Sequence, residues 1–368
     1  MTTRVHDGIS NSHWRILSAA FACVALFGLV SCSGGSSSSP ASASHLAYVA
    51  GGQTNVVGLR INSSGAFQTI LGSPFVAGRG PSSVMVHPSN KFLFVANQGE
   101  GTISLFTIDP TSGALTEVLP RTTAGISPVA MAMDTGGNFL YVANQGANPS
   151  ILAFSIGPSG ALSLVGSPIA IGSSPSGITL SSAGFLYVPV PNFSAIYVFA
   201  VNSGALTQVG LPFFVSDGVA TLAVDPAGKF LFVPNPSTGT VTVLTIQSDG
   251  SLAAGPGAFA ASTSPVAATT DLTGKYLYVA NFGSTTISQY TIDSTTGALS
   301  TFTSTTSTPT AGTNPTFIIH DPNGQFVYVG NQGSSSLTEF TIKSDGSLTS
   351  TSNSTTLGVQ PRSLAITK

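Results

Sequence analysis

Charged side chains are scarce in this chain of 368 residues, because Asp, Glu, Lys and Arg together make up only 7% of it. Ordinary globular proteins contain about 25%. The net charge is −2 and no segment concentrates basic residues, so the chain lacks the basic stripe with which proteins contact nucleic acids. The charged helix formers are equally few, whereas Gly (41) and Pro (23) are abundant. We therefore expect almost no helix and no nucleic-acid partner.

Cysteine is also rare, and both cysteines, Cys23 and Cys32, lie near the N-terminus. The surrounding segment is organised like an export signal, because two arginines are followed by an apolar run at 16–30 that is too short to span a bilayer comfortably. The run ends in Leu29-Val30-Ser31-Cys32, which resembles the bacterial lipobox. That resemblance implies cleavage before Cys32 and acylation of its thiol.

Residues 1–31 are therefore expected to form a lipoprotein signal peptide, and residues 32–45 a lipidated Cys32 with a flexible Ser/Gly linker. The mature domain would belong to the cell envelope and reach the membrane only through this anchor. It would contain no disulfide, thiolate nucleophile or cysteine metal ligand, since Cys23 is removed and the Cys32 thiol is acylated. The alternative is an ordinary signal peptide in which Cys32 stands by chance.

A short aromatic and apolar pattern, clearest as Phe-Leu-Tyr-Val-Ala-Asn, recurs seven times. Its copies occupy residues 46–51, 92–97, 139–144, 185–190, 230–235, 276–281 and 326–331. The aromatic residue before the shared Val recurs every 45 to 50 residues, from Tyr48 to Tyr328. Such a period with strand-like content is typical of a propeller. Runs rich in Phe, Tyr and Val suit strands buried on both faces, as the second strand of a propeller blade is.

Residues 81–119 show the organisation of one repeat, with strands expected at 81–87, 92–97, 102–109 and 114–119. Asp and Gly recur in the links between the first and second strands and between the third and fourth. Asp accepts hydrogen bonds from nearby backbone N–H groups and Gly adopts positive φ, so these Asp residues are expected to organise turns rather than to catalyse a reaction. They are Asp109, Asp134, Asp225, Asp249, Asp271, Asp293, Asp321 and Asp345.

The two ends of the repeat region are complementary. The first repeat begins at its second strand, and the chain ends in residues 361–367, which match 81–87 and 315–321 as a lone first strand. The last strand is therefore expected to complete the first blade. This closure would hide both open sheet edges. The sequence thus predicts an all-β fold, a seven-bladed propeller of four-stranded antiparallel blades over 46–368, and a monomer.

The repeat also resembles a known family. The segments 225–233 (DPAGKFLFV) and 274–281 (GKYLYVAN) carry the pattern best, and they are similar to the YVTN-type repeats of the lactonase β-propeller family. The resemblance covers essentially everything after residue 45. It implies a seven-bladed propeller. The enzymes of that family, which include 6-phosphogluconolactonases and muconate lactonising enzymes, act on carboxylated or phosphorylated small molecules near the propeller axis.

The antiparallel blades give the ring two unlike faces. The Asp- and Gly-containing turns lie at one end of every blade, which we call the turn face. The loops that follow the second strands and those that connect the blades lie at the other end, the loop face. Five of the second strands end in Asn, which is usually followed by Gln-Gly. Because Asn tolerates left-handed backbone conformations, we favour a turn role for this set over a ring of ligand amides.

Four residues that interrupt the repeat at the loop face are the candidate site. Arg79 and Arg362 lie beside the prolines that begin the first strands of two adjacent blades, so their guanidiniums are expected to approach the channel mouth. There they could bind a carboxylate or phosphate. The alternative is that they are unrelated surface arginines. Glu100 and Asp217 also lie in loop-face segments and are the candidate bases for activating a water molecule.

The other titratable residues are not expected to form a catalytic or metal-binding site. Glu117 and Glu339 fall within strands and are expected on outer surfaces. His45, His87 and His320 share no spacing typical of metal ligands, so we expect neither a metal nor a cofactor. Two functions remain open. One is hydrolysis, outside the cytoplasm, of a small anionic lactone. The other is non-enzymatic binding of an envelope protein or glycan by a rigid scaffold.

Overall fold

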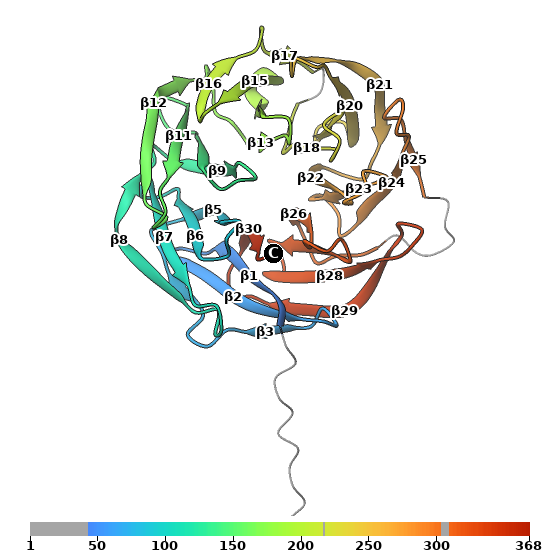
Figure 1. The fold of residues 1–368 in the computed structure, drawn as a ribbon. Coiled ribbons are helices and arrows are strands. Elements are labelled where there is room, and N and C mark those ends of the chain that lie inside the picture. Colours follow the sequence, from blue (N-terminus) through green and yellow to red (C-terminus); the bar gives the residue numbers. More distant parts are fainter. Residues whose placement is uncertain (1–42, 216–217, 303–308) are drawn as a thin grey trace, which may run out of the picture. The chain divides into compact units, whose positions relative to one another are not determined.

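The computed structural model describes residues 43–215, 218–302 and 309–368. They form seven antiparallel sheets arranged in a ring (Figure 1). In this part of the chain the one helical element is the short 3₁₀ turn η1 (Pro191–Phe193), and no helix is long and apolar enough to cross a membrane. The predicted all-β, seven-bladed propeller is confirmed.

The blades are numbered in chain order, and their strands are given from the innermost outward. Blade 1 contains β30 (Pro361–Ile366), β1 (Ala43–Gly51), β2 (Asn55–Asn62) and β3 (Phe67–Thr69), with β4 (Phe75–Val76) also paired to β2. Blade 2 contains β5 (Pro81–Val86), β6 (Phe92–Asn97), β7 (Thr102–Ile108) and β8 (Leu115–Thr123), and blade 3 contains β9 (Pro128–Met133), β10 (Phe139–Asn144), β11 (Ser150–Ile156) and β12 (Leu162–Ala170). Blade 4 contains β13 (Thr179–Leu180), β14 (Phe185–Val190), β15 (Ala195–Asn202) and β16 (Ala205–Gln208), with β17 (Phe213–Phe214) also paired to β15.

Blades 5 to 7 repeat the same order without an extra strand. Blade 5 contains β18 (Ala223–Val224), β19 (Phe230–Asn235), β20 (Thr240–Ile246) and β21 (Leu252–Ala260). Blade 6 contains β22 (Pro265–Thr270), β23 (Tyr276–Asn281), β24 (Ile287–Ile292) and β25 (Leu299–Thr301). Blade 7 contains β26 (Pro315–His320), β27 (Phe326–Asn331), β28 (Ser336–Ile342) and β29 (Leu348–Thr356).

The second strand of each blade is buried on both faces, as its composition predicts. In β10, for example, Leu140, Tyr141, Val142 and Ala143 are fully buried. The aromatic residue also joins neighbouring blades. The hydroxyls of Tyr48, Tyr187 and Tyr278 donate to backbone carbonyls in turns of the next blade, at Gly113 (2.8 Å), Gly250 (3.1 Å) and Gly346 (2.7 Å). In blades 1, 4 and 6 the repeat thus links one blade to the next by a hydrogen bond.

The aspartates assigned to turns do accept backbone hydrogen bonds from their own turns. In blades 5, 6 and 7, Oδ1 of Asp225, Asp271 and Asp321 accepts the N–H groups four and five residues further along the chain, at 2.6 to 2.8 Å. The other five make similar bonds within their turns. Hydrogen bonds from Ser112 keep the pKa of Asp109 below its ordinary value. These carboxylates are therefore structural, as predicted.

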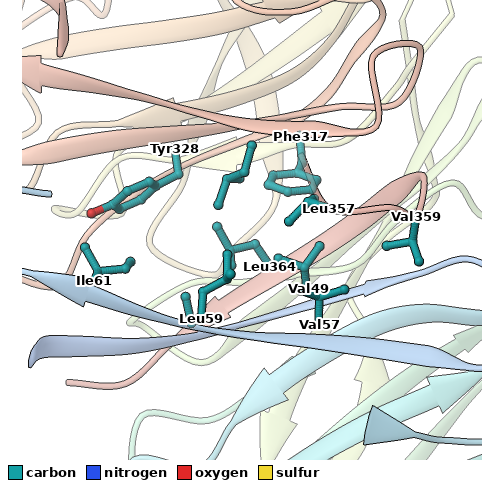
Figure 2. Close-up of a cluster of buried hydrophobic side chains, with 11 residues drawn as sticks. Val49, Val57, Leu59, Ile61, Phe317, Tyr328, Leu357, Val359 and Leu364 are labelled. Carbon is teal, nitrogen blue, oxygen red and sulfur yellow. The ribbon is translucent and has the colours of Figure 1, made fainter. Parts of the chain in front are cut away.

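The chain closes the ring as expected. The C-terminal strand β30 pairs with β1 in antiparallel register from Ala47↔Ile366 to Gly51↔Pro361. Leu364 of β30 packs with Val49 of β1 and Phe317 of β26 in the core between blades 7 and 1 (Figure 2). Just beyond the strand, the Thr367 hydroxyl accepts the Leu46 N–H at 2.8 Å. The first and last strands of the described chain are thus held in one sheet.

Two inner strands are shortened by proline. Strands β13 and β18 contain only two residues each, whereas the corresponding strands of the other blades contain six. Their partner strands carry Pro189 and Pro234 where most copies of the repeat have Ala. Proline has no N–H to donate to the ladder. The inner strands of blades 4 and 5 are therefore paired with their neighbours over fewer residues near the loop face.

Candidate functional site

The asparagines that end the second strands are neither left-handed turn residues nor exposed ligands. Asn97, Asn281 and Asn331 are fully buried and do not have positive φ. The Nδ2 group of Asn97 donates to the hydroxyls of Thr102 (3.1 Å) and Ser104 (3.0 Å) on the next strand. Asn281 and Asn331 make equivalent bonds. The predicted left-handed conformation was wrong, because the Asn side chain binds hydroxyls of the next strand while its carbonyl accepts N–H groups of the loop.

In blade 2, Gln98 and Gly99 follow Asn97 and are hydrogen-bonded to the segment before β5. We call these two residues the platform of the loop face. The N–H groups of Gln98 and Gly99 donate to the carbonyls of Gly80 and Arg79, both at 2.9 Å. A Cβ on Gly99 would lie only 3.1 Å from the Arg79 carbonyl oxygen. Blades 3, 6 and 7 repeat this pair of bonds. Glycine at position 99 therefore eases the close approach of two backbones.

Both candidate arginines reach this platform. Nη2 of Arg79 donates to the Gly99 carbonyl at 3.0 Å, and Nη1 of Arg362 donates to Oε1 of Gln98 at 2.8 Å. Arg362 is the second residue of β30 rather than a loop residue. Both side chains are exposed, and among the described residues neither forms an ion pair. Two guanidiniums from adjacent blades are thus brought to adjacent residues of one loop.

Arg362 stands at a position where three of the other six blades have a hydroxyl residue. Two of these, Ser82 and Thr316, donate to backbone carbonyls in the inner strand of the following blade, at Pro128 (2.7 Å) and Pro361 (3.2 Å). Arg362 likewise contacts the following blade, blade 2, but it does so through a side-chain amide in an exposed loop. Blade 1 therefore carries an arginine where these blades carry a short inter-blade hydrogen bond.

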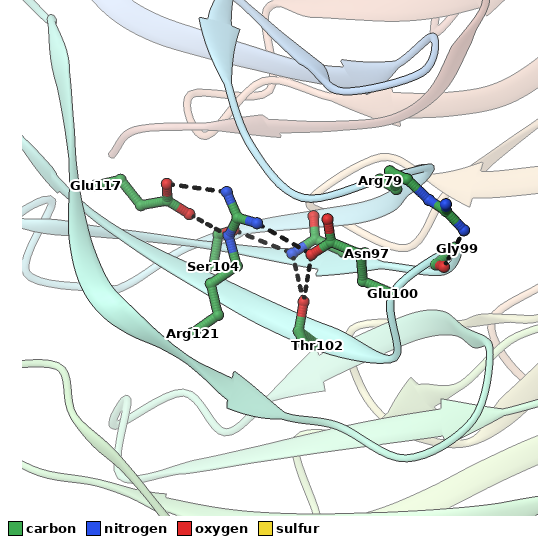
Figure 3. A network of polar contacts seen from close by, with 8 residues as sticks. All are labelled: Arg79, Asn97, Gly99, Glu100, Thr102, Ser104, Glu117 and Arg121. Carbon is green, nitrogen blue, oxygen red and sulfur yellow. Dashed lines mark hydrogen bonds and ion pairs between the residues drawn. The ribbon is translucent and has the colours of Figure 1, made fainter.

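Glu100 lies beside this platform within an ion-pair network (Figure 3). Nη1 of Arg121 donates to Oε2 of Glu100 at 3.0 Å, while Nε and Nη2 of the same guanidinium bind the carboxylate of Glu117 at 2.7 and 3.1 Å. The hydroxyl of Thr102 also donates to Glu100, at 3.3 Å. Arg121 and Glu117 both lie on the outermost strand β8. The network therefore connects the loop after β6 to the outermost strand β8 of the same blade.

These contacts keep Glu100 ionised. Partial burial alone would raise the pKa of Glu100, but the backbone N–H of Arg79 and the charge of Arg121 outweigh it, so the pKa lies below its ordinary value. Glu100 can therefore accept hydrogen bonds from water over a wide pH range. Its low pKa also makes it a weaker base than an isolated carboxylate. Asp217, the other candidate base, lies outside the described residues.

A depression of about 570 Å³ adjoins Arg362 at the seam between blades 7 and 1. Amide and hydroxyl side chains supply most of its polar lining. They are Gln53, Thr54, Asn55, Ser335 and Gln360. Arg362 is the one charged residue that lines it. This surface suits a polar ligand that carries a negative charge at one end.

Glu339 does not lie on an outer surface, and that expectation was wrong. It is fully buried in β28, opposite Tyr328 of β27. Oε1 accepts a hydrogen bond from Asn353 at 3.0 Å, while Oε2 has no partner among the described residues. The carboxyl fills the space where a Cβ on Gly65 of blade 1 would lie. Burial raises the pKa of Glu339. This burial could not be read from the local pattern around Glu339, because Gly65, which covers the carboxyl, is far away in the sequence.

The histidines have structural partners. Nδ1 and Nε2 of His87 contact Ser89 (2.8 Å) and the Gly137 carbonyl (2.9 Å). Nδ1 of His45 contacts the Thr367 carbonyl at 2.8 Å, and Nδ1 of His320 contacts the Asp321 carbonyl at 2.8 Å. Within the described ranges, no three residues of His, Cys, Asp or Glu are grouped so that they could hold a metal ion.

The propeller geometry agrees with the comparison to protein families. The model of the family "Lactonase, 7-bladed beta-propeller" matches residues 43–174, 146–263, 215–314 and 273–368, which together span the whole repeat region. The chain belongs to the seven-bladed β-propeller lactonase family. No curated protein sequence matches it.

Solved structures similar to this lactonase-family chain include two described as putative 6-phosphogluconolactonases. The one from Bacteroides fragilis is 22% identical, with a TM-score of 0.77 over 88% of this chain and 98% of that chain. The one from Bacteroides uniformis is 18% identical, with a TM-score of 0.76 over 88% and 99%. The periplasmic gluconolactonase of Pseudomonas aeruginosa is 20% identical, with a TM-score of 0.72 over 88% and 99%. At these identities the likeness concerns the fold.

Proposed function

We propose that this lactonase-family propeller binds a small lactone bearing a carboxylate or phosphate at its loop face and hydrolyses it. The observation that carries the proposal is the meeting of Arg79 and Arg362 at Gln98 and Gly99. Both guanidiniums are exposed and lack a carboxylate partner among the described residues. Each therefore has N–H groups free to bind an anion in a forked geometry. Membership of the lactonase family supports the reaction type.

The reaction would use the loop-face residues as follows. The oxygen of a water molecule forms a bond to the lactone carbonyl carbon while Glu100 accepts the water proton. The bond from that carbon to the ring oxygen then breaks. The proton passes to the released oxygen, and the product is a hydroxy acid. Arg121 keeps Glu100 ionised for this role. Asp217, which lies outside the described residues, is the alternative base.

Removal of both guanidiniums tests the proposal. In a pH-stat assay over a panel of anionic lactones, corrected for spontaneous hydrolysis, we expect Arg79→Ala and Arg362→Ala each to lower kcat/KM by about 10- to 100-fold, since a hydrogen bond to a charged group contributes about 1.5–3 kcal/mol. Lys229→Ala, which removes a lysine from the turn face of blade 5, is the matched control and should keep full activity. Equal activity in all three variants would contradict the assigned site.

The second candidate is a non-enzymatic propeller that binds an envelope protein or glycan. One observation favours it: Glu100 is already paired with Arg121, and Arg362 is the one titratable residue that lines the depression. A site with amides, hydroxyls and arginine can bind without catalysing. A folded wild-type protein that hydrolyses no lactone in the panel would select this function over the enzyme.

We also propose that acylated Cys32 anchors the protein in the cell envelope, although Cys32 lies outside the described residues. The apolar run 16–30 and the lipobox-like ending support this localisation. Several acyl chains hold a soluble domain firmly, because each buried CH₂ contributes about 0.8 kcal/mol. In fractionated cells, Cys32→Ala should move the protein from the membrane to the soluble fraction. Retention of the variant in the membrane would rule out the anchor.

A further inference from the structure

A second basic pocket lies on the turn face, at the seam between blades 1 and 2. Its volume is about 480 Å³. Of the eleven Lys and Arg residues in the chain, Arg60, Lys91 and Lys368 line it. No acidic side chain is among its lining residues. In a protein with so few charges, the convergence of three cations on one pocket needs a physical reason, because like charges repel one another.

Hydrogen bonds hold the segments that carry these cations. Lys368 follows β30, and its main chain is held by Asn90, which donates to a carboxylate oxygen of Lys368 at 2.9 Å and accepts the Lys368 N–H at 3.1 Å. Asn90 is in the left-handed conformation, with φ of 58°, and precedes Lys91 in the same turn. Nη2 of Arg60 donates to the Thr111 carbonyl at 2.5 Å. The pocket is thus formed by segments of blades 1 and 2 that hydrogen bonds hold in place.

Neighbouring titratable groups do not neutralise the pocket. Asp109, which lies close enough to Arg60 for their charges to interact, is bound by the backbone N–H groups of its own turn. His45 lines the pocket, but its Nδ1 contacts the Thr367 carbonyl and its Nε2 contacts Asn323, both at 2.8 Å. Among the described residues, none of the three cations forms an ion pair. The carboxylate of Lys368, which Asn90 binds, and the nearby Asp109 offset part of this positive charge, but three cations still outnumber these two carboxylates.

The apolar residues that line the pocket narrow the chemical class of ligand that it suits. Leu46, Ile108 and Pro110 give the pocket an apolar wall beside its cations. Apolar surface favours a ligand with an apolar body, while lysine and arginine favour a phosphate or carboxylate. We propose that this pocket is a second anion-binding site, which takes a small organic anion with an apolar part, such as an aryl or alkyl phosphate. It lies at the opposite end of the six-residue strand β30 from Arg362, about 20 Å away.

Phenyl phosphate is a suitable probe, and isothermal titration calorimetry measures its binding. The experiment uses the Arg79→Ala/Arg362→Ala double variant, so that the loop-face arginines contribute nothing. We expect saturable 1:1 binding, weakened at least about tenfold by a further Arg60→Gln or Lys91→Gln substitution. Inorganic phosphate should bind more weakly than phenyl phosphate, because it cannot contact the apolar wall.

Lys275→Gln is the matched control, since Lys275 occupies the same place in its turn in blade 6 as Lys91 does in blade 2. It should leave phenyl phosphate binding unchanged. Absence of saturable binding to the folded double variant would overturn the proposal, and so would equal weakening by Lys91→Gln and Lys275→Gln. Because the loop-face arginines are absent throughout, either result is independent of the proposed lactonase activity.

Discussion

Deletion of residues 361–368 is expected to abolish cooperative folding. The deletion removes β30, which leaves the β1 edge without its partner over the register from Ala47 to Gly51. It also removes Leu364 from the core between blades 7 and 1 (Figure 2). An unpaired edge with a buried sequence is a template for aggregation. Thermal unfolding followed by circular dichroism, together with light scattering, should show loss of the single transition and formation of aggregates.

Two further variants make this result specific to ring closure. Deletion of Lys368 alone removes contacts with Asn90 but keeps Thr367 and β30, so the transition should persist. Leu364→Ala keeps the strand but removes a buried side chain, and it should lower the free energy of unfolding by about 2–5 kcal/mol. An unchanged melting temperature after deletion of 361–368 would show that the seam contributes little to the fold.

Replacement of the buried Glu339 by Gln is expected to remove a pH dependence of stability. Burial raises the pKa of Glu339 in the folded protein, whereas an unfolded Glu titrates near pH ~4.3. As the pH rises through that value, the unfolded chain releases its proton first, which favours unfolding. The wild type should therefore lose stability from about pH 4.3 up to the raised pKa of Glu339. At low pH the contribution of the neutral side chain is fully present.

The Gln side chain fits this position because blade 6 already has one. Gln289 pairs with Tyr278 as Glu339 pairs with Tyr328. At pH 8 we expect Glu339→Gln to raise the free energy of unfolding by about 1–3 kcal/mol, the usual penalty of an unsatisfied buried polar group. The gain should shrink toward pH 4. Urea unfolding of both proteins from pH 4 to 9 measures it, and a constant difference across that range would contradict a buried, partly unsatisfied carboxyl.

The fold could be predicted from the sequence because each repeat signals its own strands and turns locally. In blade 2, β6 coincides with the predicted strand 92–97, β5 and β7 each end one residue earlier than predicted, and β8 extends to Thr123. Ring closure was also predictable, because the final strand resembles the first strands of other blades. These features depend on side-chain periodicity and turn residues, which sequence patterns record directly.

Features that depend on which side chains meet across different strands or blades could not be predicted. Whether Asn97 is exposed depends on the hydroxyls that it meets on the next strand, and the pattern alone suggested a turn. Glu339 is buried by blade 1 across the closing seam, far away in sequence. The pairing of Arg121 with Glu100 likewise joins an outer strand to a loop. Arg79 and Arg362 were chosen as candidates because they interrupt the repeat, and the structure adds the loop that both contact. Their role as an anion site stays a prediction.

Comparison of two matched lactones, identical except that one carries a phosphate or carboxylate, tests the central claim most directly. The quantity to measure is the ratio of kcat/KM for the anionic lactone to that for the neutral one, in the wild type and in Arg362→Ala. We expect the wild type to prefer the anionic lactone by at least about tenfold, as one charged hydrogen bond allows. Arg362→Ala should lose most of that preference while hydrolysing the neutral lactone nearly as well. An equal ratio in both proteins would contradict the assignment of the loop-face arginines as the anion site.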